Sequence, residues 1–234
     1  MFVKKIILSN VVIMLALFST LNMNAQDWAN LKRFQEANAQ LRTPAKGEKR
    51  VVFIGNSITE GWINTHPNFF SENPYINRGI GGQTTPQMLV RFRQDVIELQ
   101  PSVVAILAGT NDIAGNTGPS TLEMIQNNLA SMAEIAAANG IKVVLSSVLP
   151  AYEYPWRKEV TEVAAKIIKL NTMIKDYCER KGFTYLDYHT PMADERNGMI
   201  AEYTTDGVHV TSKGYDLMET LVQDAIQKAL KKKR

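Results

Sequence analysis

Three polar residues of this chain, Ser57, His209 and Asp206, are of the types that form a nucleophilic triad. A serine hydroxyl is a weak nucleophile at neutral pH and needs an adjacent base, and a neutral imidazole is suited to that task. Asp206 lies three residues before His209, so a local turn can bring its carboxylate to the imidazole and fix the tautomer. The spacing predicts a base and its orienting acid in one loop, with the nucleophile far away in sequence.

The stretch around Ser57 has two interpretations. Val51 to Ile54 is an apolar, β-branched run typical of a buried strand, and it breaks at Gly55 before Asn56 and Ser57. A helix opening after Ser57 would point its N-terminal N–H groups back at the serine and favour developing negative charge. The less specific interpretation is a strand–turn–helix corner in which Ser57 is only the N-cap.

A tetrahedral intermediate also requires N–H donors. Gly82 can bring its backbone N–H close to a substrate because it has no side chain. Asn111 offers a side-chain amide. Asp112 beside it is expected to have a structural role in the same loop.

The elements that must position these residues alternate between strands and helices along the chain. The pattern predicts one domain over residues 26–234, of the α/β class: a three-layer α/β/α sandwich around a five-stranded parallel sheet with right-handed crossovers. Each polar cluster follows a strand or enters a helix, so all of them can meet in one crevice at the carboxyl ends of the strands. Strands are expected at about 50–54, 75–80, 103–108, 141–148 and 183–187, and helices at about 27–41, 84–100, 120–138 and 158–180 and from Ser212 or Lys213 to the C-terminus.

The first 25 residues differ from the rest of the chain. Lys4 and Lys5 precede a mostly apolar run, and small Ala25 follows it. This pattern predicts a signal peptide over residues 1–25, cleaved near Ala25, and therefore a periplasmic or secreted protein with no stable membrane span after cleavage. The alternative is an uncleaved anchor helix, for which the apolar run is short. No cysteine lies near the cleavage point, so a lipid anchor is not expected there.

Composition argues against several classes of function. The 234 residues are 45% hydrophobic and 21% charged, which is ordinary for a globular domain. The excess of 26 Lys and Arg over 23 Asp and Glu lies in the leader and in the basic tail 231–234, so no nucleic-acid surface is predicted. The single cysteine, Cys178, cannot form an intramolecular disulfide. The three histidines are far apart without ligand-spaced partners, so neither a metal nor a cofactor is expected. Oligomeric state is left open.

Four short motifs, in this order and spacing, resemble the four sequence blocks of the GDSL/SGNH hydrolase family. They are Gly-Asn-Ser-Ile-Thr at 55–59, Asn-Arg-Gly-Ile-Gly-Gly-Gln-Thr-Thr at 77–85, Gly-Thr-Asn-Asp at 109–112 and Asp-Gly-Val-His at 206–209. The resemblance covers about residues 50–230 and is strongest to bacterial esterases of the platelet-activating-factor acetylhydrolase type. It implies a flavodoxin-like SGNH hydrolase fold, with Ser57 as nucleophile, Asp206 and His209 as acid and base, and an oxyanion hole formed by the Ser57 N–H, Gly82 and Asn111.

This chain departs from the family pattern at two positions. Asn56 stands where the family name has aspartate, at a position that is not one of its catalytic groups. Gln83 stands where an aspartate often follows the second-block glycine, which removes one charge near the expected site.

The leading functional hypothesis is a secreted serine esterase that removes short acyl groups, acetyl above all, from a small-molecule or glycan ester. The first alternative is a lysophospholipase or thioesterase acting on longer acyl chains, and the second is a non-catalytic carbohydrate-binding domain. Trp62, Tyr154 and Trp156 are candidates for an aromatic wall of the substrate pocket, with ordinary core packing as the alternative. His66 and His189 lack the motif context of His209 and are expected to be surface or loop residues.

Overall fold

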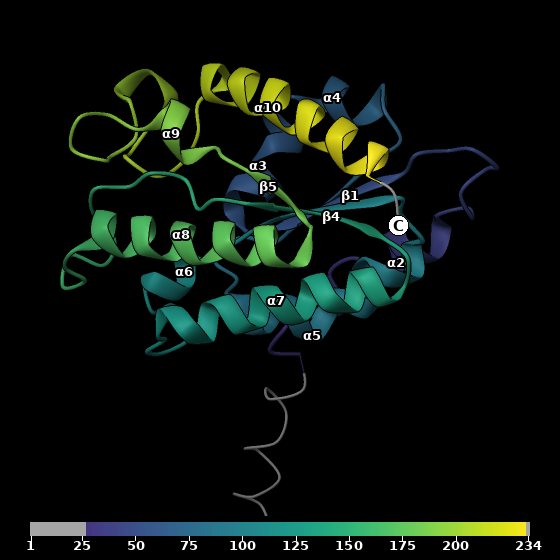
Figure 1. Cartoon of the computed structure of the whole chain (residues 1–234), viewed down its shortest axis with the longest axis horizontal. Helices are drawn as coiled ribbons and strands as arrows, with labels where there is room; N and C mark the ends of the chain where they lie inside the picture. The colour runs from purple at the N-terminus through teal and green to yellow at the C-terminus, as the bar shows by residue number, and fades with distance from the viewer. Residues whose placement is uncertain (1–26, 233–234) are drawn as a thin grey trace, which may run out of the picture.

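The computed structural model describes residues 27–232 and arranges them in three layers, with helices on both faces of one sheet (Figure 1). The strands are β1 (Val51–Gly55), β2 (Tyr75–Gly79), β3 (Val103–Leu107), β4 (Lys142–Ser146) and β5 (Thr184–Leu186). They pair in the order β2-β1-β3-β4-β5, and every pairing is parallel. The predicted fold class is therefore confirmed.

The strands read as continuous apolar runs because both faces of the sheet are covered. Successive side chains point to opposite faces, so β1 sends Val52 and Ile54 into one core and Val51 and Phe53 into the other. The first core packs against α5 (Thr85–Asp95), α7 (Leu122–Ala138) and α8 (Val163–Lys181). The second packs against α3 (Ser57–Thr65), α4 (Pro67–Ser71) and α10 (Ser212–Lys231). Figure 1 shows α7 and α8 below the sheet and α10 above it.

Strand order places a crevice at the carboxyl end of β1. From β1 the chain moves outward to β2, returns through α5 to β3 on the other side of β1, and then continues to β4 and β5. Open parallel sheets bind ligands where the order reverses in this way, outside the carboxyl ends of the strands. The segments that leave β1, β2 and β3 there begin with Asn56, Ile80 and Ala108. The predicted serine, glycine and asparagine donors follow these three residues.

The predicted strands agree with the observed strands to within about two residues. Five short elements complete the fold. The short elements are α2 (Gln35–Gln40), η1 (Ile97–Leu99), α6 (Thr110–Ile113), α9 (His189–Met192) and η2 (Ala201–Tyr203). Thr84 is the N-cap of α5, with Gln87 completing a capping box. The last helix begins at Ser212, as predicted.

Three helix predictions need correction. The helix expected over 84–100 ends at Asp95, because Val96 has a φ of −131°, and η1 follows as a separate turn. The helix expected over 27–41 is present only as Gln35–Gln40, because Asn30 has a left-handed φ of 56° and the segment before it bonds to distant side chains. The helix expected from about 158 begins at Val163, after Glu162, which also has a left-handed φ of 56°. The predicted signal peptide lies outside the described residues. Across residues 27–232, none of the helices combines the length and the apolar character that crossing a membrane requires.

Candidate active site

Ser57 is the first residue of α3, directly after β1 and Asn56. Asn56 is the N-cap residue, and its side chain makes no capping hydrogen bond. Ser57 is therefore not the N-cap residue, because it lies inside the first turn of α3. Its own N–H is one of the helix N-terminal donors that have no partner within the helix. Two glycines let α3 pack closely here: a Cβ on Gly79 would lie 2.2 Å from the backbone nitrogen of Glu60, and one on Gly55 would lie 2.9 Å from the Thr59 Cβ.

A continuous chain of hydrogen bonds connects Ser57, His209 and Asp206. The Ser57 Oγ lies 3.2 Å from His209 Nε2, and His209 Nδ1 lies 2.7 Å from Asp206 Oδ2. The other carboxylate oxygen of Asp206 accepts the backbone N–H groups of Val208, at 2.9 Å, and of His209, at 2.7 Å. Acid and base thus share one tight turn, and the structure brings the three residues together as the sequence predicted.

The same turn keeps Asp206 ionised. Partial burial favours the neutral acid, but the hydrogen bonds from the backbone N–H and imidazole of His209 and from the backbone N–H of Val208 outweigh it. The pKa of the Asp206 carboxyl is therefore lowered from its usual value. A carboxylate charged at neutral pH holds the Nδ1–H tautomer of His209, which leaves Nε2 free to accept the serine proton.

The two remaining predicted donors lie on loops that flank β1. Gly82 is exposed and has a left-handed φ of 74°. Asn111 is buried in α6, and its Nδ2 donates to the backbone oxygen of Gln83 at 2.9 Å. Only one of the two Asn111 amide hydrogens is needed for this bond. A Cβ built on Gly81 would lie 3.9 Å from the Ser57 Cβ, so the glycine loop adjoins the nucleophile candidate.

Three contacts from different elements hold the 81–83 loop in place. Glu60 of α3 accepts the Gly81 N–H at 2.9 Å, Asn116 donates to the Gly82 oxygen at 3.2 Å, and Asn111 holds Gln83 as described above. All three contacts reach backbone atoms of the loop. Gln83 has a second attachment, through its side chain. The loop is therefore fixed from α3, from α6 and from the segment after α6.

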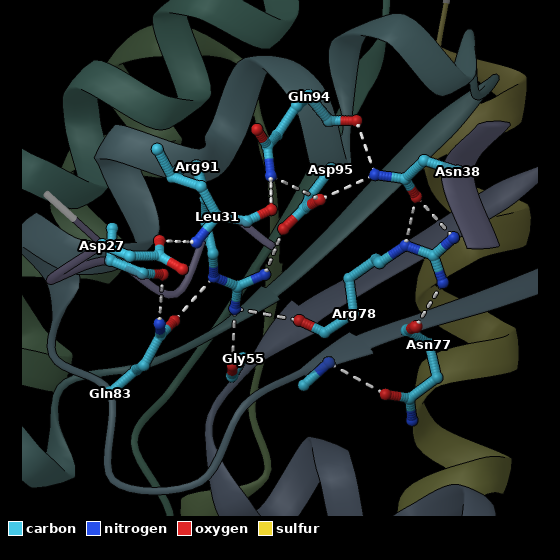
Figure 2. A network of polar contacts seen from close by, with 12 residues as sticks. Asp27, Leu31, Asn38, Gly55, Asn77, Arg78, Gln83, Arg91, Gln94 and Asp95 are labelled. Carbon is cyan, nitrogen blue, oxygen red and sulfur yellow. Dashed lines mark hydrogen bonds and ion pairs between the residues drawn. The ribbon is translucent and has the colours of Figure 1, made fainter. Parts of the chain in front are cut away.

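Gln83 connects this loop to a buried polar network that the sequence did not predict (Figure 2). Its Oε1 accepts Arg91 Nε at 2.6 Å. Arg91 is fully buried and also donates to Asp95 at 3.0 Å, to the Gly55 oxygen at 3.1 Å and to the Arg78 oxygen at 2.9 Å. One guanidinium thus joins the ends of β1 and β2 to the glycine loop.

Asp112 has the structural position that was expected. Its carboxylate accepts the backbone N–H of Thr85, at 2.9 and 3.1 Å, and the Thr85 hydroxyl, at 2.5 Å. Thr85 is the first residue of α5, so the carboxylate lies at the positive end of that helix. Burial nevertheless dominates and raises the pKa of Asp112 to about 6.

The aromatic wall needs correction at two of its three residues. Trp62 is 1% exposed and packs in the core against Phe53, Phe69 and Tyr215, because it lies four residues after buried Ile58 on the same face of α3. Tyr154 is 0% exposed beneath Trp156. Neither can form a wall that a substrate touches.

Trp156 remains as the exposed aromatic residue beside the triad. It is 41% exposed, and its ring centroid lies 6.1 Å from that of His209. It lines a cavity of about 560 Å³ that begins at the glycine loop. The other residues that line this cavity are mostly polar: Asp27, Trp28, Asn30, Ile80, Gly81, Gly82, Gln83, Gln87, Asn116, Thr117 and Arg157. A second cavity, of about 540 Å³, lies where β4 and β5 begin, so size alone does not select the site.

A second serine–histidine–carboxylate contact lies away from the glycine loop. His66 Nε2 is 2.9 Å from Ser212 Oγ, and His66 Nδ1 is 2.6 Å from Glu219. None of these three residues lines the 560 Å³ cavity, and neither do Ser57, Asp206 and His209. What distinguishes Ser57 from Ser212 is its place beside the glycine loop, where a Cβ on Gly81 would lie 3.9 Å from the Ser57 Cβ. His189 is also separate from the site, but it is half-buried at the start of α9 rather than in a surface loop, and burial lowers its pKa.

The comparisons with known proteins identify the family and support the fold. The model of the GDSL-like lipase/acylhydrolase family matches residues 53–217, so the chain belongs to that family. A solved structure of a GDSL-like lipase from Bacteroides thetaiotaomicron is 53% identical, with a TM-score of 0.84, over 86% of this chain and 98% of that chain.

Two curated relatives match over a smaller part of their length. Esterase TesA of Pseudomonas aeruginosa is 32% identical over 42% of this chain and 50% of its own. An acetylxylan esterase of Xylanibacter ruminicola is 24% identical over 79% of this chain and 44% of its own. The chain thus spans about half the length of these relatives.

Proposed function

We propose that this chain is a serine ester hydrolase in which Ser57 forms an acyl-enzyme. The observation that carries the proposal is the unbroken contact from the Ser57 hydroxyl through His209 to a carboxylate, beside the Gly82 loop. Ser57 Oγ attacks the ester carbonyl carbon while His209 Nε2 takes its proton. The resulting imidazolium is stabilised by Asp206. The negative charge on the carbonyl oxygen is stabilised by the N–H groups of Ser57 and Gly82 and by the free amide hydrogen of Asn111.

The two halves of the reaction use the same groups. Collapse of the first tetrahedral intermediate breaks the ester C–O bond, and His209 gives its proton to the departing alcohol. A water molecule then loses a proton to His209 and attacks the acyl carbon. Collapse of this second intermediate releases the carboxylic acid and returns the proton to Ser57 Oγ. No group beyond these side chains and one water molecule is needed for the balance.

The test is replacement of the nucleophile. Ser57→Ala is expected to lower hydrolysis of p-nitrophenyl acetate at least about 10³-fold while the circular dichroism spectrum is unchanged. Ser212→Ala is the matched control, because Ser212 also contacts a histidine that contacts a carboxylate. It is expected to keep wild-type activity. Full activity of Ser57→Ala would refute the proposal.

A short acyl group on a polar alcohol is the proposed substrate class, and an acetylated carbohydrate is the leading candidate. Asp27, Asn30, Gln87, Asn116 and Arg157 around the cavity suit hydroxyl groups better than a lipid chain. The name of the acetylxylan esterase relative supports the same class. Comparing kcat/KM for acetyl and octanoyl esters of one alcohol tests it: a preference for octanoyl would favour the lysophospholipase or thioesterase alternative.

We infer that the protein is exported, on the basis of the leader pattern over residues 1–25. Expression with the intact leader is expected to place the mature chain in the periplasm or medium, starting near Gln26. Fractionation followed by N-terminal sequencing of the purified protein measures both. Recovery of an unprocessed chain from the membrane fraction would favour the anchor-helix alternative.

A further inference from the structure

Residues 27–31, here called the N-terminal wall, form one side of the 560 Å³ cavity. Asp27, Trp28 and Asn30 line it, and the indole of Trp28 is 48% exposed. The wall is a compact turn rather than a helix, since Asn30 has a left-handed φ and the Asp27 carboxylate accepts the N–H of Leu31. An exposed indole beside polar side chains is a surface that binds one face of a sugar ring.

Three glutamine side chains attach this wall to the rest of the fold. Each donates its amide to a different backbone carbonyl of the wall: Gln87 to Trp28 at 2.7 Å, Gln83 to Ala29 at 2.7 Å and Gln94 to Leu31 at 2.6 Å. The bonds to the wall from Gln83 and Gln94 appear in Figure 2. The left-handed φ of Asn30 prevents a helix from beginning at residue 27, and these bonds hold the carbonyl groups of the resulting turn.

Gln83 attaches the wall to the proposed oxyanion hole. Its Nε2 donates to Ala29, its Oε1 accepts from Arg91, and its backbone oxygen accepts the amide of Asn111. An aspartate at this position has only acceptor oxygens, so it can accept from Arg91 but cannot donate to Ala29. The departure of this chain from the family pattern at Gln83 therefore coincides with the attachment of its N-terminal wall.

Gln87 has a similar double role. Its Oε1 accepts the N–H of Thr84 at 3.0 Å and so caps α5, while its Nε2 holds the carbonyl of Trp28. Glutamate is as good as glutamine at the capping position but has no N–H to give. Gln87→Glu therefore removes the attachment of Trp28 and keeps the helix cap.

We propose that the N-terminal wall is the specificity element for the alcohol part of the substrate. In this role Trp28 binds the sugar ring of an acylated glycan, while Asp27 and Asn30 form hydrogen bonds with its hydroxyls. The inference rests on the proposed ester hydrolysis at Ser57. The acyl group lies at the glycine loop, and the alcohol extends from there into the cavity along Trp28. Trp156, whose ring centroid lies 6.1 Å from that of His209, lines the same cavity.

The first experiment compares two acetate esters on Trp28→Ala. The probes are a mono-O-acetylated methyl glycoside, whose ring reaches the wall, and methyl acetate, which ends at the reacting carbonyl. The ratio of kcat/KM for the glycoside to that for methyl acetate is expected to fall about tenfold, mainly through a higher KM for the glycoside. Tyr152→Ala is the matched control: Tyr152 is 53% exposed and is not among the residues that line the cavity, so its ratio is expected to stay within about twofold of wild type.

The second experiment tests the attachment. Gln87→Glu is expected to lower the same ratio and to speed hydrogen exchange at amides 28–33 about tenfold, while the melting temperature stays within about 2 °C because the cap is kept. Gln227→Glu, at an exposed position of α10, is the control and is expected to change neither quantity.

The outcomes separate the two proposals. An unchanged ratio in Trp28→Ala, with Ser57-dependent hydrolysis of both esters by the wild type, overturns the role of the wall and leaves the proposed function standing. Hydrolysis that survives in Ser57→Ala, or a wild-type protein inactive on both esters, overturns the proposed function and the role of the wall together.

Discussion

Arg91 is the side chain whose loss is expected to affect this fold most sharply. It is 0% exposed and donates to four acceptors, Gln83, Asp95, Gly55 and Arg78. Arg91→Met keeps much of the volume but leaves the Asp95 carboxylate, also buried, without its charge partner. Removing one partner of a buried ion pair costs about 3–5 kcal/mol. Since about 1 kcal/mol shifts the melting temperature of a domain this size by about 2–4 °C, we expect a decrease of roughly 6–20 °C.

The assay is urea unfolding followed by circular dichroism, with calorimetry for the melting temperature. The control is Arg33→Met, because Arg33 pairs with Glu60 at 3.3 Å on the surface. Exposed pairs contribute about 0–1 kcal/mol, so this variant is expected to be nearly neutral. The double variant Arg91→Met/Asp95→Leu is expected to be more stable than Arg91→Met alone, because no uncompensated charge remains buried. Equal effects of Arg91→Met and Arg33→Met would refute the reasoning.

Three further predictions concern the site. Asp112 keeps its proton up to about pH 6 in the folded protein but only up to about pH 3.8 in the unfolded chain, so stability should fall as pH rises between these values. Melting temperatures measured from pH 3 to 8 should therefore vary less with pH in that window for Asp112→Asn than for the wild type. Parallel curves would contradict this. Asn111→Ala should lower kcat about 10²–10³-fold with p-nitrophenyl acetate, and a loss under threefold would exclude it from the oxyanion hole. Gly79→Ala should lose about 1–3 kcal/mol in urea unfolding, because its Cβ would overlap the backbone of Glu60; a neutral effect would contradict that packing.

The strands and the turn that joins Asp206 to His209 were predictable because their signals are local. A five-residue apolar run such as Val103–Leu107 identifies a buried parallel strand without reference to anything else in the chain. Asp206 and His209 are three residues apart, and the turn that joins them is stabilised by the backbone of the same residues. Ser57 could be assigned from the order of the motifs, and the fold then places it beside His209.

The features that escaped prediction depend on contacts between distant segments. Nothing in the sequence near Trp28 shows that glutamines some 55 to 65 residues later will bind its segment, so helical periodicity was the stronger local signal there. Arg91 was missed for the same reason, because its acceptors lie on β1, β2 and the glycine loop. Trp62 was misplaced although a signal existed: its spacing of four from Ile58 puts both on the buried face of α3.

The turn that carries Asp206 and His209 has a consequence for how activity in this fold can change. The two ends of the turn are bonded to each other: Thr204 Oγ1 donates to the His209 oxygen at 2.9 Å, and Thr204 pairs with Val210 in an antiparallel bridge. Any shift of α10 therefore carries acid and base together and leaves the bond between them intact. What such a shift changes is the gap to Ser57, because several contacts join α10 to α3: Tyr215 donates to the Ile58 oxygen at 2.7 Å, and His66, directly after α3, contacts Ser212 and Glu219. The geometry of proton transfer thus depends on the separation of these two helices, while the acid–base pair is held by the hydrogen bonds of its own turn.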